Sequence, residues 1–174
     1  FLPAATVTWE FLPNHQFRAA FSKTINRPSL RELTTSPFLD PDRAEFVEGN
    51  PFLKVAELTN YDARWEWYMD NGDYFSLGGF YKEIQNPIEQ TFKFVGADEQ
   101  RRTFINAQKA DLFGIEAEVE FGIPLSDWIP ALGTRDFFVR GNGAYINSDV
   151  TINPSDIGIL TDTTRRLQGQ SEWL

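Results

Sequence analysis

The residues best suited to chemistry in this sequence are three glutamates at alternate positions, Glu116, Glu118 and Glu120. Alternate residues of an extended chain point to the same side, so these carboxylates would line one face of a strand. Such a row could hold a cation or supply a general acid and a general base. Because the intervening residues Ala117 and Val119 are apolar, strand alternation alone explains the row. We therefore interpret the glutamates as the hydrated face of a sheet.

Signatures of other catalytic and metal sites are missing from the sequence. It has no cysteine, which excludes disulfides, thiolate catalysis and cysteine-ligated zinc. His15 is the only histidine and lies in a predicted tight turn, so no second histidine can share a metal ion with it. No nucleophile-elbow, phosphate-loop or dinucleotide motif occurs, and Gly78-Gly79 is interpreted as space for neighbouring aromatic rings. We expect no catalytic residue, no metal site, no cofactor and no enzymatic activity.

The composition excludes further classes of protein. The 174-residue chain carries a formal net charge of -9, whereas nucleic acids are bound through clustered lysine and arginine residues. We therefore expect no nucleic-acid partner. No run of about 18 apolar residues is present, which excludes a membrane-spanning helix. Aromatic residues make up 15% of the chain, which is high for a mean hydropathy of -0.37.

Seven segments alternate between apolar and polar residues with the period of two that half-buried strands show. Each complete segment has about ten residues, which exceeds the five or six that are usual in soluble sheets. The expected strands are 2–11, 16–25, 60–70, 73–84, 110–121, 136–147 and 168–174. Tight turns alternate with long loops at 26–59, 85–109 and 148–167. The pattern predicts an all-β, antiparallel up-and-down meander with tight turns at one end and long loops at the other.

The hairpin around the Asp-Asn-Gly turn at 70–72 allows its register to be predicted. A three-residue loop with the glycine in the left-handed conformation pairs Trp67 with Phe75 and Trp65 with Leu77. A two-residue turn would instead mix polar and apolar residues on the tryptophan face. Since a slip of one residue exchanges the two faces of a strand, we predict the three-residue loop. One face of the hairpin is then apolar, and the opposite face is mainly charged and polar.

Many aromatic residues are expected at one height of the sheet, close to the tight turns. They are Trp9, Phe11, Phe17, Trp67, Tyr68, Tyr74, Phe75, Phe121, Phe137 and Phe138. Aromatic rings favour the interface between membrane and water. Long alternating strands, short turns at one end, long loops at the other and an aromatic girdle together indicate the wall of an outer-membrane β-barrel. A soluble β-sandwich also alternates apolar and polar residues and stays open as an alternative.

Several motifs resemble the barrel region of TonB-dependent outer-membrane receptors. The most specific are N-R-P-S-L-R-E-L at 26–33 and G-N-P-F-L-K at 49–54. T-N-Y-D at 59–62, F-Y-K-E-I at 80–84, G-I-E-A-E at 114–118 and G-N-G-A-Y at 141–145 are also similar to that family. The resemblance covers nearly the whole chain. It implies a barrel of roughly 22 strands, plugged by an N-terminal domain, that imports a scarce ligand using energy from an inner-membrane complex.

The resemblance also implies partners and a location in the bacterial outer membrane. The implied partners are outer-membrane lipid, the plug domain, the TonB complex acting through the plug, and a small extracellular ligand such as a siderophore, cobalamin, saccharide or peptide. About seven strands are fewer than the eight of the smallest single-chain barrels. We therefore expect a segment of the C-terminal half of a receptor barrel, without its plug. A passive porin-like barrel and a soluble ligand-binding β-sandwich are the alternatives.

The long loops would be extracellular, and they supply the candidate ligand-binding residues. The loop 26–59 is too long to be a mere connector, and the adjacent arginines of the next loop could meet an anionic ligand. The candidates are Arg27, Arg31, Glu32, Asn50, Arg101 and Arg102. Their alternative role is structural, because the arginine-proline and glycine-asparagine-proline motifs could fix where the chain leaves and re-enters the wall.

Overall fold

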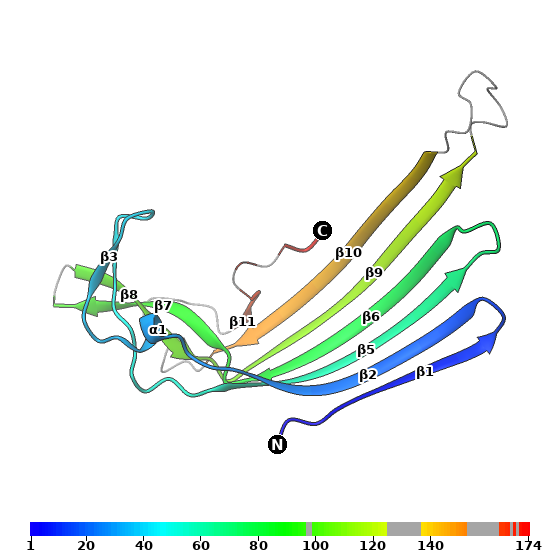
Figure 1. Ribbon diagram of the computed structural model, residues 1–174. Coiled ribbons are helices and arrows are strands. Elements are labelled where there is room, and N and C mark those ends of the chain that lie inside the picture. Colours follow the sequence, from blue (N-terminus) through cyan, green and yellow to red (C-terminus); the bar gives the residue numbers. More distant parts are fainter. Residues whose placement is uncertain (97–98, 125–136, 153–163, 168, 170) are drawn as a thin grey trace.

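The computed structural model describes residues 1–96, 99–124, 137–152, 164–167, 169 and 171–174. The described elements form two sheets (Figure 1). The larger sheet has seven strands in the order β1 (Ala4–Leu12), β2 (His15–Asn26), β5 (Ala56–Tyr68), β6 (Tyr74–Gln85), β9 (Lys109–Ile123), β10 (Phe137–Thr151) and β11 (Thr164–Arg165). All of its neighbouring strands are antiparallel. The predicted all-β up-and-down meander is confirmed.

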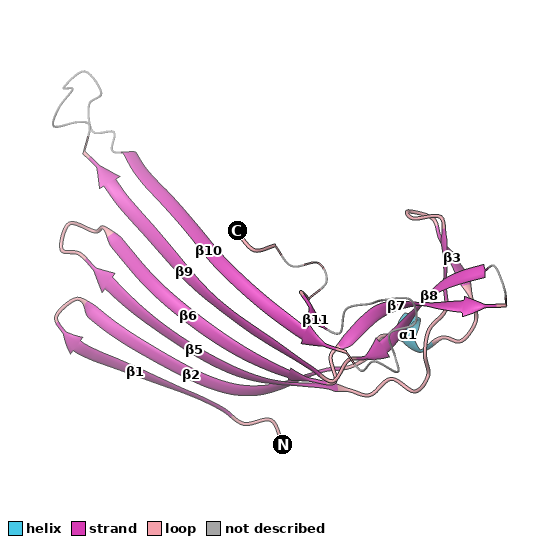
Figure 2. Ribbon diagram, turned by 180° about the vertical axis from the view of Figure 1, so that it is seen from behind, coloured by secondary structure: helices cyan, strands magenta, loops and turns pink. Residues whose placement is uncertain are grey.

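The long loops predicted at 26–59 and 85–109 contain a second sheet, whose strands were not predicted from the sequence. Its four strands, in the order β3, β4, β8 and β7, follow the short helix α1 in the chain. These elements are α1 (Leu30–Leu33), β3 (Phe38–Asp40), β4 (Glu45–Val47), β7 (Ile88–Val95) and β8 (Glu99–Asn106). We call this unit the loop sheet. It lies at the end of the larger sheet opposite to the β1–β2 and β5–β6 hairpins (Figure 2).

The seventh strand begins earlier than the expected range 168–174. Pairing with β10 starts at Thr164 and Arg165 of β11 and resumes as a single bridge between Tyr145 and Trp173. The Leu174 backbone also exchanges two hydrogen bonds with that of Ala144, at 3.0 and 3.1 Å. Residues 168 and 170 of the expected strand, and 153–163 of the expected third loop, lie outside the described residues. The tail therefore pairs along the free edge of β10, but with an interruption.

The predicted register of the β5–β6 hairpin is confirmed. Trp65 lies opposite Leu77, and Trp67 lies opposite Phe75. Gly72 has a φ of 89°, which is the left-handed conformation that the three-residue loop requires. The Met69 backbone closes this loop, since its N–H donates to Asp73 at 2.9 Å and its carbonyl accepts from Gly72 at 3.0 Å. Turn chemistry thus places the tryptophans on one face of the wall.

Among the described residues, no second layer covers the larger sheet along most of its length (Figures 1 and 2). The buried apolar cluster of the chain sits at the loop-sheet end, around Ala107, Ala110, Val150 and Ile152. Ile84, Ile105 and Leu167 pack against this cluster. Among the described helices, none has the length and apolar character to cross a membrane. Packing therefore anchors the loop sheet to the larger sheet, which we call the wall. No other described element covers either face of the β1–β2 and β5–β6 hairpins.

Candidate functional site

One face of the larger sheet is apolar and exposed. Val7 is 67% exposed, Trp9 63% and Ile115 55%. Cross-strand pairing places such residues in rows, as with Trp9 opposite Phe17, which lies opposite Trp65. A shallow apolar depression on this face is lined by Val7, Ala19, Phe21, Ala63, Tyr61 and their neighbours. Contiguous exposed apolar surface of this extent marks a surface that meets a partner or a membrane.

Most of the predicted girdle residues gather on the apolar face near the tight turns, whereas Tyr68, Tyr74 and Phe138 lie on the polar face with Arg64 and Arg140. His15 stacks between Trp65 and Trp67, with ring centroids 5.7 and 5.4 Å away. The indole N–H of Trp65 donates to Nδ1 of His15 at 3.3 Å. Trp9 and Phe11 extend the contacts along the edge strand, 5.6 Å apart. The single histidine is therefore a member of an aromatic cluster, a role that sequence reasoning missed because the register of β2 against β5 was not predicted.

Charged residues border the apolar face on the side nearest the loop sheet. Lys109 Nζ lies 3.0 Å from Asp111 and 3.6 Å from Glu83. The hydroxyl of Tyr81 donates to Asp111 at 2.5 Å. Tyr81 also stacks with Tyr61 at 6.3 Å between ring centroids. The apolar face is thus a band bordered by aromatic rings near the hairpin turns and by tyrosines and ion pairs near the loop sheet.

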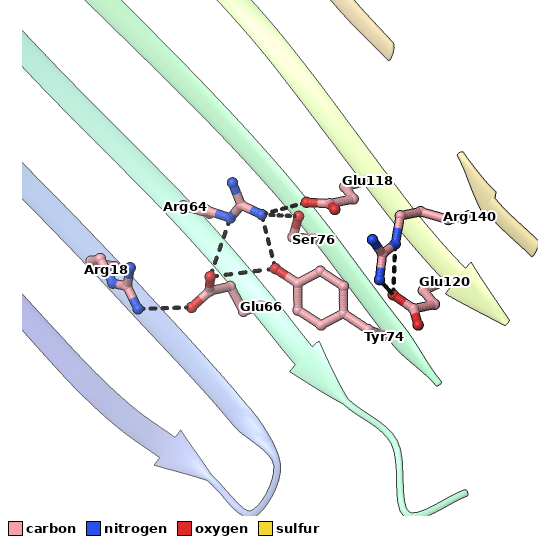
Figure 3. Close-up of polar contacts among 8 residues, drawn as sticks. All are labelled: Arg18, Arg64, Glu66, Tyr74, Ser76, Glu118, Glu120 and Arg140. Atoms are coloured by element: carbon pink, nitrogen blue, oxygen red, sulfur yellow. Dashed lines mark hydrogen bonds and ion pairs between the residues drawn. The ribbon is translucent and has the colours of Figure 1, made fainter. Parts of the chain in front are cut away.

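The opposite face carries a network of ion pairs (Figure 3). Arg64 is its centre: its guanidinium lies 3.2 Å from Glu66 and 2.9 Å from Glu118. The same group donates to the hydroxyls of Tyr74 at 2.9 Å and Ser76 at 2.8 Å. Glu66 is only 5% exposed, so it requires compensation, and Arg18 adds a second cation at 3.4 Å. These contacts join strands β2, β5, β6 and β9.

The three alternating glutamates lie on this polar face but differ in their surroundings. Glu118 pairs with Arg64, and Glu120 pairs with Arg140 at 2.6 Å. Glu116 has no hydrogen bond or ion pair with a described residue. A Cβ at position 78 would come within 3.2 Å of two Glu116 side-chain atoms, so Gly78 leaves room for that side chain. Glu116 lines a cavity of about 230 Å³ together with Arg64, Asn142 and others.

Glu32 and Asn50, two of the loop residues predicted to bind ligand, form contacts that hold α1 against the segment around Gly49 and against β8. Ser29 caps α1, accepting from the Glu32 N–H, while the Glu32 carboxylate accepts from the Ser29 N–H at 2.7 Å. The Glu32 carbonyl accepts from the Asn50 N–H, and the Asn50 side chain donates to the Phe104 carbonyl at 3.0 Å. A Cβ at Gly49 would lie 2.6 Å from the Glu32 and Thr34 carbonyl oxygens. The structure thus places the motif at 26–33 in contact with the motif at 49–54.

The predicted arginines are mostly engaged inside the loop sheet. Arg31 lies over the Phe38 ring at 4.4 Å and 3.9 Å from Asp40. Arg101 pairs with Glu48 and Glu99. Arg102 pairs with Glu45, donates to Gln90 at 3.1 Å and lies over Phe92. Arg27 is exposed and has no side-chain hydrogen bond or ion pair to the described part of the chain. Arg31, Glu32 and Arg102 line one cavity together with Arg43 and the carboxylates of Asp40 and Asp42. Arg102 also lines a second cavity, with Arg43 and Arg165.

Two carboxylates that the sequence analysis did not single out form ion pairs at the loop sheet, Glu48 half-buried and Glu89 buried. The hydrogen bond from Lys93 at 2.6 Å, helped by Arg101, lowers the pKa of Glu48. Burial raises the pKa of Glu89, although Arg165 lies 2.8 Å away and opposes that shift. The Glu89–Arg165 pair joins β7 to β11. Nothing in the local sequence predicts this pairing, because the two residues are separated by strands β8, β9 and β10.

No curated protein matches the chain. Among solved structures, the siderophore receptor PirA from Pseudomonas aeruginosa matches with a TM-score of 0.59 and 14% identity. The match covers 89% of this chain and 31% of the PirA chain, so this chain spans about a third of that receptor's length. At this identity the similarity concerns the fold.

A family model describes the chain over its full length. The model for the β-barrel of TonB-dependent receptor-like proteins matches residues 1–174. Its members are transport proteins of the outer membrane of Gram-negative bacteria. The exposed apolar band, the ion-paired opposite face and the hairpins at one end agree with a segment of such a barrel wall. The chain belongs to the TonB-dependent receptor family, as part of its β-barrel.

Proposed function

We propose that this chain forms part of the outer-membrane wall of an energy-coupled importer. The observation that carries the proposal is the difference between the two faces of one long-stranded sheet. The apolar face exposes Val7, Trp9 and Ile115, and hydrocarbon is the solvent that such side chains favour. The opposite face holds charged residues such as Arg64 and Glu118, which suit a water-filled lumen.

The ends of the sheet give its orientation in the proposed membrane. Short turns of outer-membrane barrels face the periplasm, and long loops face outward. The turns after β1 and β5 would therefore be periplasmic, and the loop sheet would lie at the cell surface. The His15 cluster would lie at the inner interface, and Tyr61 and Tyr81 would lie near the outer one.

The polar face is the proposed contact surface for the plug domain. Glu116 has no partner among the described residues and borders a cavity of about 230 Å³. An unpaired carboxylate beside an open cavity is suited to water or to a basic side chain from a domain inside the barrel. The TonB complex would act on this wall only through that plug. We propose no catalytic step.

The imported ligand is proposed to be a scarce small molecule: a siderophore, cobalamin, a saccharide or a peptide. Siderophores are the first class to test, because the structural relative is a siderophore receptor. Arg27 is the candidate ligand residue that is most available, since it is exposed and unpaired within the described segments. Arg31, Glu32, Asn50 and Arg101 would act mainly by shaping the loop sheet.

The test uses the intact receptor that contains this chain, expressed in a Gram-negative host. We expect it in the outer-membrane fraction, with an electrophoretic mobility that changes on heating, and with ligand uptake that stops when the proton gradient is collapsed. Uptake that persists without the gradient would support the porin-like alternative. Recovery of a monodisperse soluble protein without detergent would overturn the proposal in favour of a sandwich.

A further inference from the structure

A cavity of about 500 Å³ lies where the loop sheet meets the tail of the chain. Its lining includes Arg43, Gln90, Thr91, Phe92, Arg102 and Arg165. These residues come from the β3–β4 turn, from β7, from β8 and from β11. The volume falls in the range of pockets that bind small molecules, which is roughly 300–1,000 Å³.

Three guanidinium groups face this cavity, and no carboxylate is among its described lining residues. Two of the three are held in place. Arg102 is 9% exposed and is fixed by Glu45 and Gln90. Arg165 donates to Glu89 at 2.8 Å and to the Gln90 carbonyl at 3.1 Å. Their acidic partners hold them from outside the lining, so the guanidinium groups need little reordering to meet a ligand.

Arg43 gives the cavity a positive charge that is not balanced by a direct partner. Its side chain is exposed at the β3–β4 turn and forms no hydrogen bond or ion pair with the described residues. Cations that converge on a partly desolvated cavity attract an anion more strongly than cations on an open surface. Guanidinium groups also present planar pairs of donors that match carboxylate and phosphate oxygens.

We propose that this cavity, which we call the arginine pocket, binds the oxyanion group of a small ligand between Arg43, Arg102 and Arg165. Gln90 and Thr91 would add polar contacts, and Phe92 would add an apolar surface. The identification of that ligand as the imported molecule rests on the proposed function. The pocket itself depends only on the geometry of the loop sheet and β11.

The test measures inorganic phosphate binding to the purified intact receptor in detergent at low salt, by calorimetry and by phosphorus NMR line broadening. Arg43→Gln removes one cation without breaking a contact among the described residues, and we expect it to weaken binding about tenfold. Arg165→Lys keeps the charge that faces Glu89 but loses the planar fork, and we expect an intermediate loss. Lys54→Gln is the matched control, because it removes an exposed cation that lies outside the pocket and whose side chain forms no hydrogen bond or ion pair with the described residues.

The outcomes separate the pocket from the proposed function. Equal binding by the wild type and Arg43→Gln, or equal weakening in Lys54→Gln, would overturn the pocket even if the receptor imports its ligand. Arg43-dependent binding to a receptor that shows no energy-dependent uptake would support the pocket and overturn the importer. A heat-dependent change in mobility, checked for each variant, shows that a loss of binding does not come from a misfolded barrel.

Discussion

Arg64 is the residue on which the polar face depends most. Replacing it with glutamine removes its ion pairs with Glu66 and Glu118 and leaves Glu66 with Arg18 as its one cation among the described residues, beside the Tyr74 hydroxyl. Because Glu66 is 5% exposed, leaving it poorly compensated is costly. We expect Arg64→Gln to lower the free energy of unfolding of the intact receptor by about 2 kcal/mol. Urea unfolding in detergent micelles, followed by electrophoretic mobility, measures the change.

Arg140→Gln is the matched control for this prediction. Arg140 also pairs with a glutamate of the same face, but its side chain is 61% exposed and that of Glu120 is 32% exposed. Exposed pairs contribute below about 1 kcal/mol. Equal losses in the two variants would show that the network around Arg64 has no special role in the wall.

At the residue scale, alternation predicted which side chains share a face but not which of them pair. Glu118 and Glu120 were placed correctly on a polar face by the pattern of strand β9. Their partners Arg64 and Arg140 lie on other strands, so the pairs depend on registers that local sequence does not contain. The ligand-binding role of Arg31, Glu32 and Asn50 stays a prediction, and their observed contacts are structural.

At the element scale, the loop sheet should respond to pH through Glu48. Its pKa is lowered from 4.5 by Lys93 and Arg101, so the folded state binds a proton less readily than the unfolded state. The stabilisation is present above pH 4.5 and is lost as the pH falls through the lowered value. We expect Glu48→Gln to make the loop sheet more open to hydrogen exchange at pH 7, with the difference from wild type shrinking in acid.

Glu89→Gln serves as the comparison, because the contribution of Glu89 to stability changes with pH in the direction opposite to that of Glu48. Burial raises the pKa of Glu89, so its contribution is fully present below pH 4.5 and declines as the pH rises through the raised value. Wild type should therefore lose stability relative to Glu89→Gln on going from acid to neutral pH. Parallel pH profiles for the two variants would contradict the assignment of these ion pairs. Hydrogen exchange of β7 and β8 amides, resolved by peptide, is the measurement.

The two sheets differ in how far sequence could predict them. Six of the seven strands of the larger sheet have 9 to 15 residues, and β11 has two. Alternation along the long strands allowed most of each one and the β5–β6 register to be predicted. Strands β3 and β4 have three residues each, too few for a period to be recognised. β4 joins β8 through one parallel residue pair, a contact between segments far apart in the chain. The arginine pocket depends on that contact and was therefore not predicted.

At the scale of the whole molecule, the wall is open on both faces and at its edges. β1 and the interrupted β10 edge present backbone groups along part of their length, and Trp9 and Ile115 remain exposed. A sheet with such edges and such an apolar face is prone to pair or aggregate in water. The 174-residue chain expressed alone is therefore expected to require detergent, refolding or edge pairing to remain in solution.

The two-faced wall can be tested directly in the intact receptor, and these 174 residues contribute no cysteine that would compete for the label. Ile115→Cys and Glu116→Cys place a nitroxide on opposite faces of β9, at positions one residue apart and both exposed. We expect the label at 115 to be relaxed mainly by oxygen dissolved in the bilayer, and the label at 116 mainly by a water-soluble nickel complex. Collision rates from power-saturation electron paramagnetic resonance in reconstituted vesicles report both. If neither relaxant favours one position over the other, the apolar face does not meet lipid, and the proposed place of this chain in the membrane is wrong.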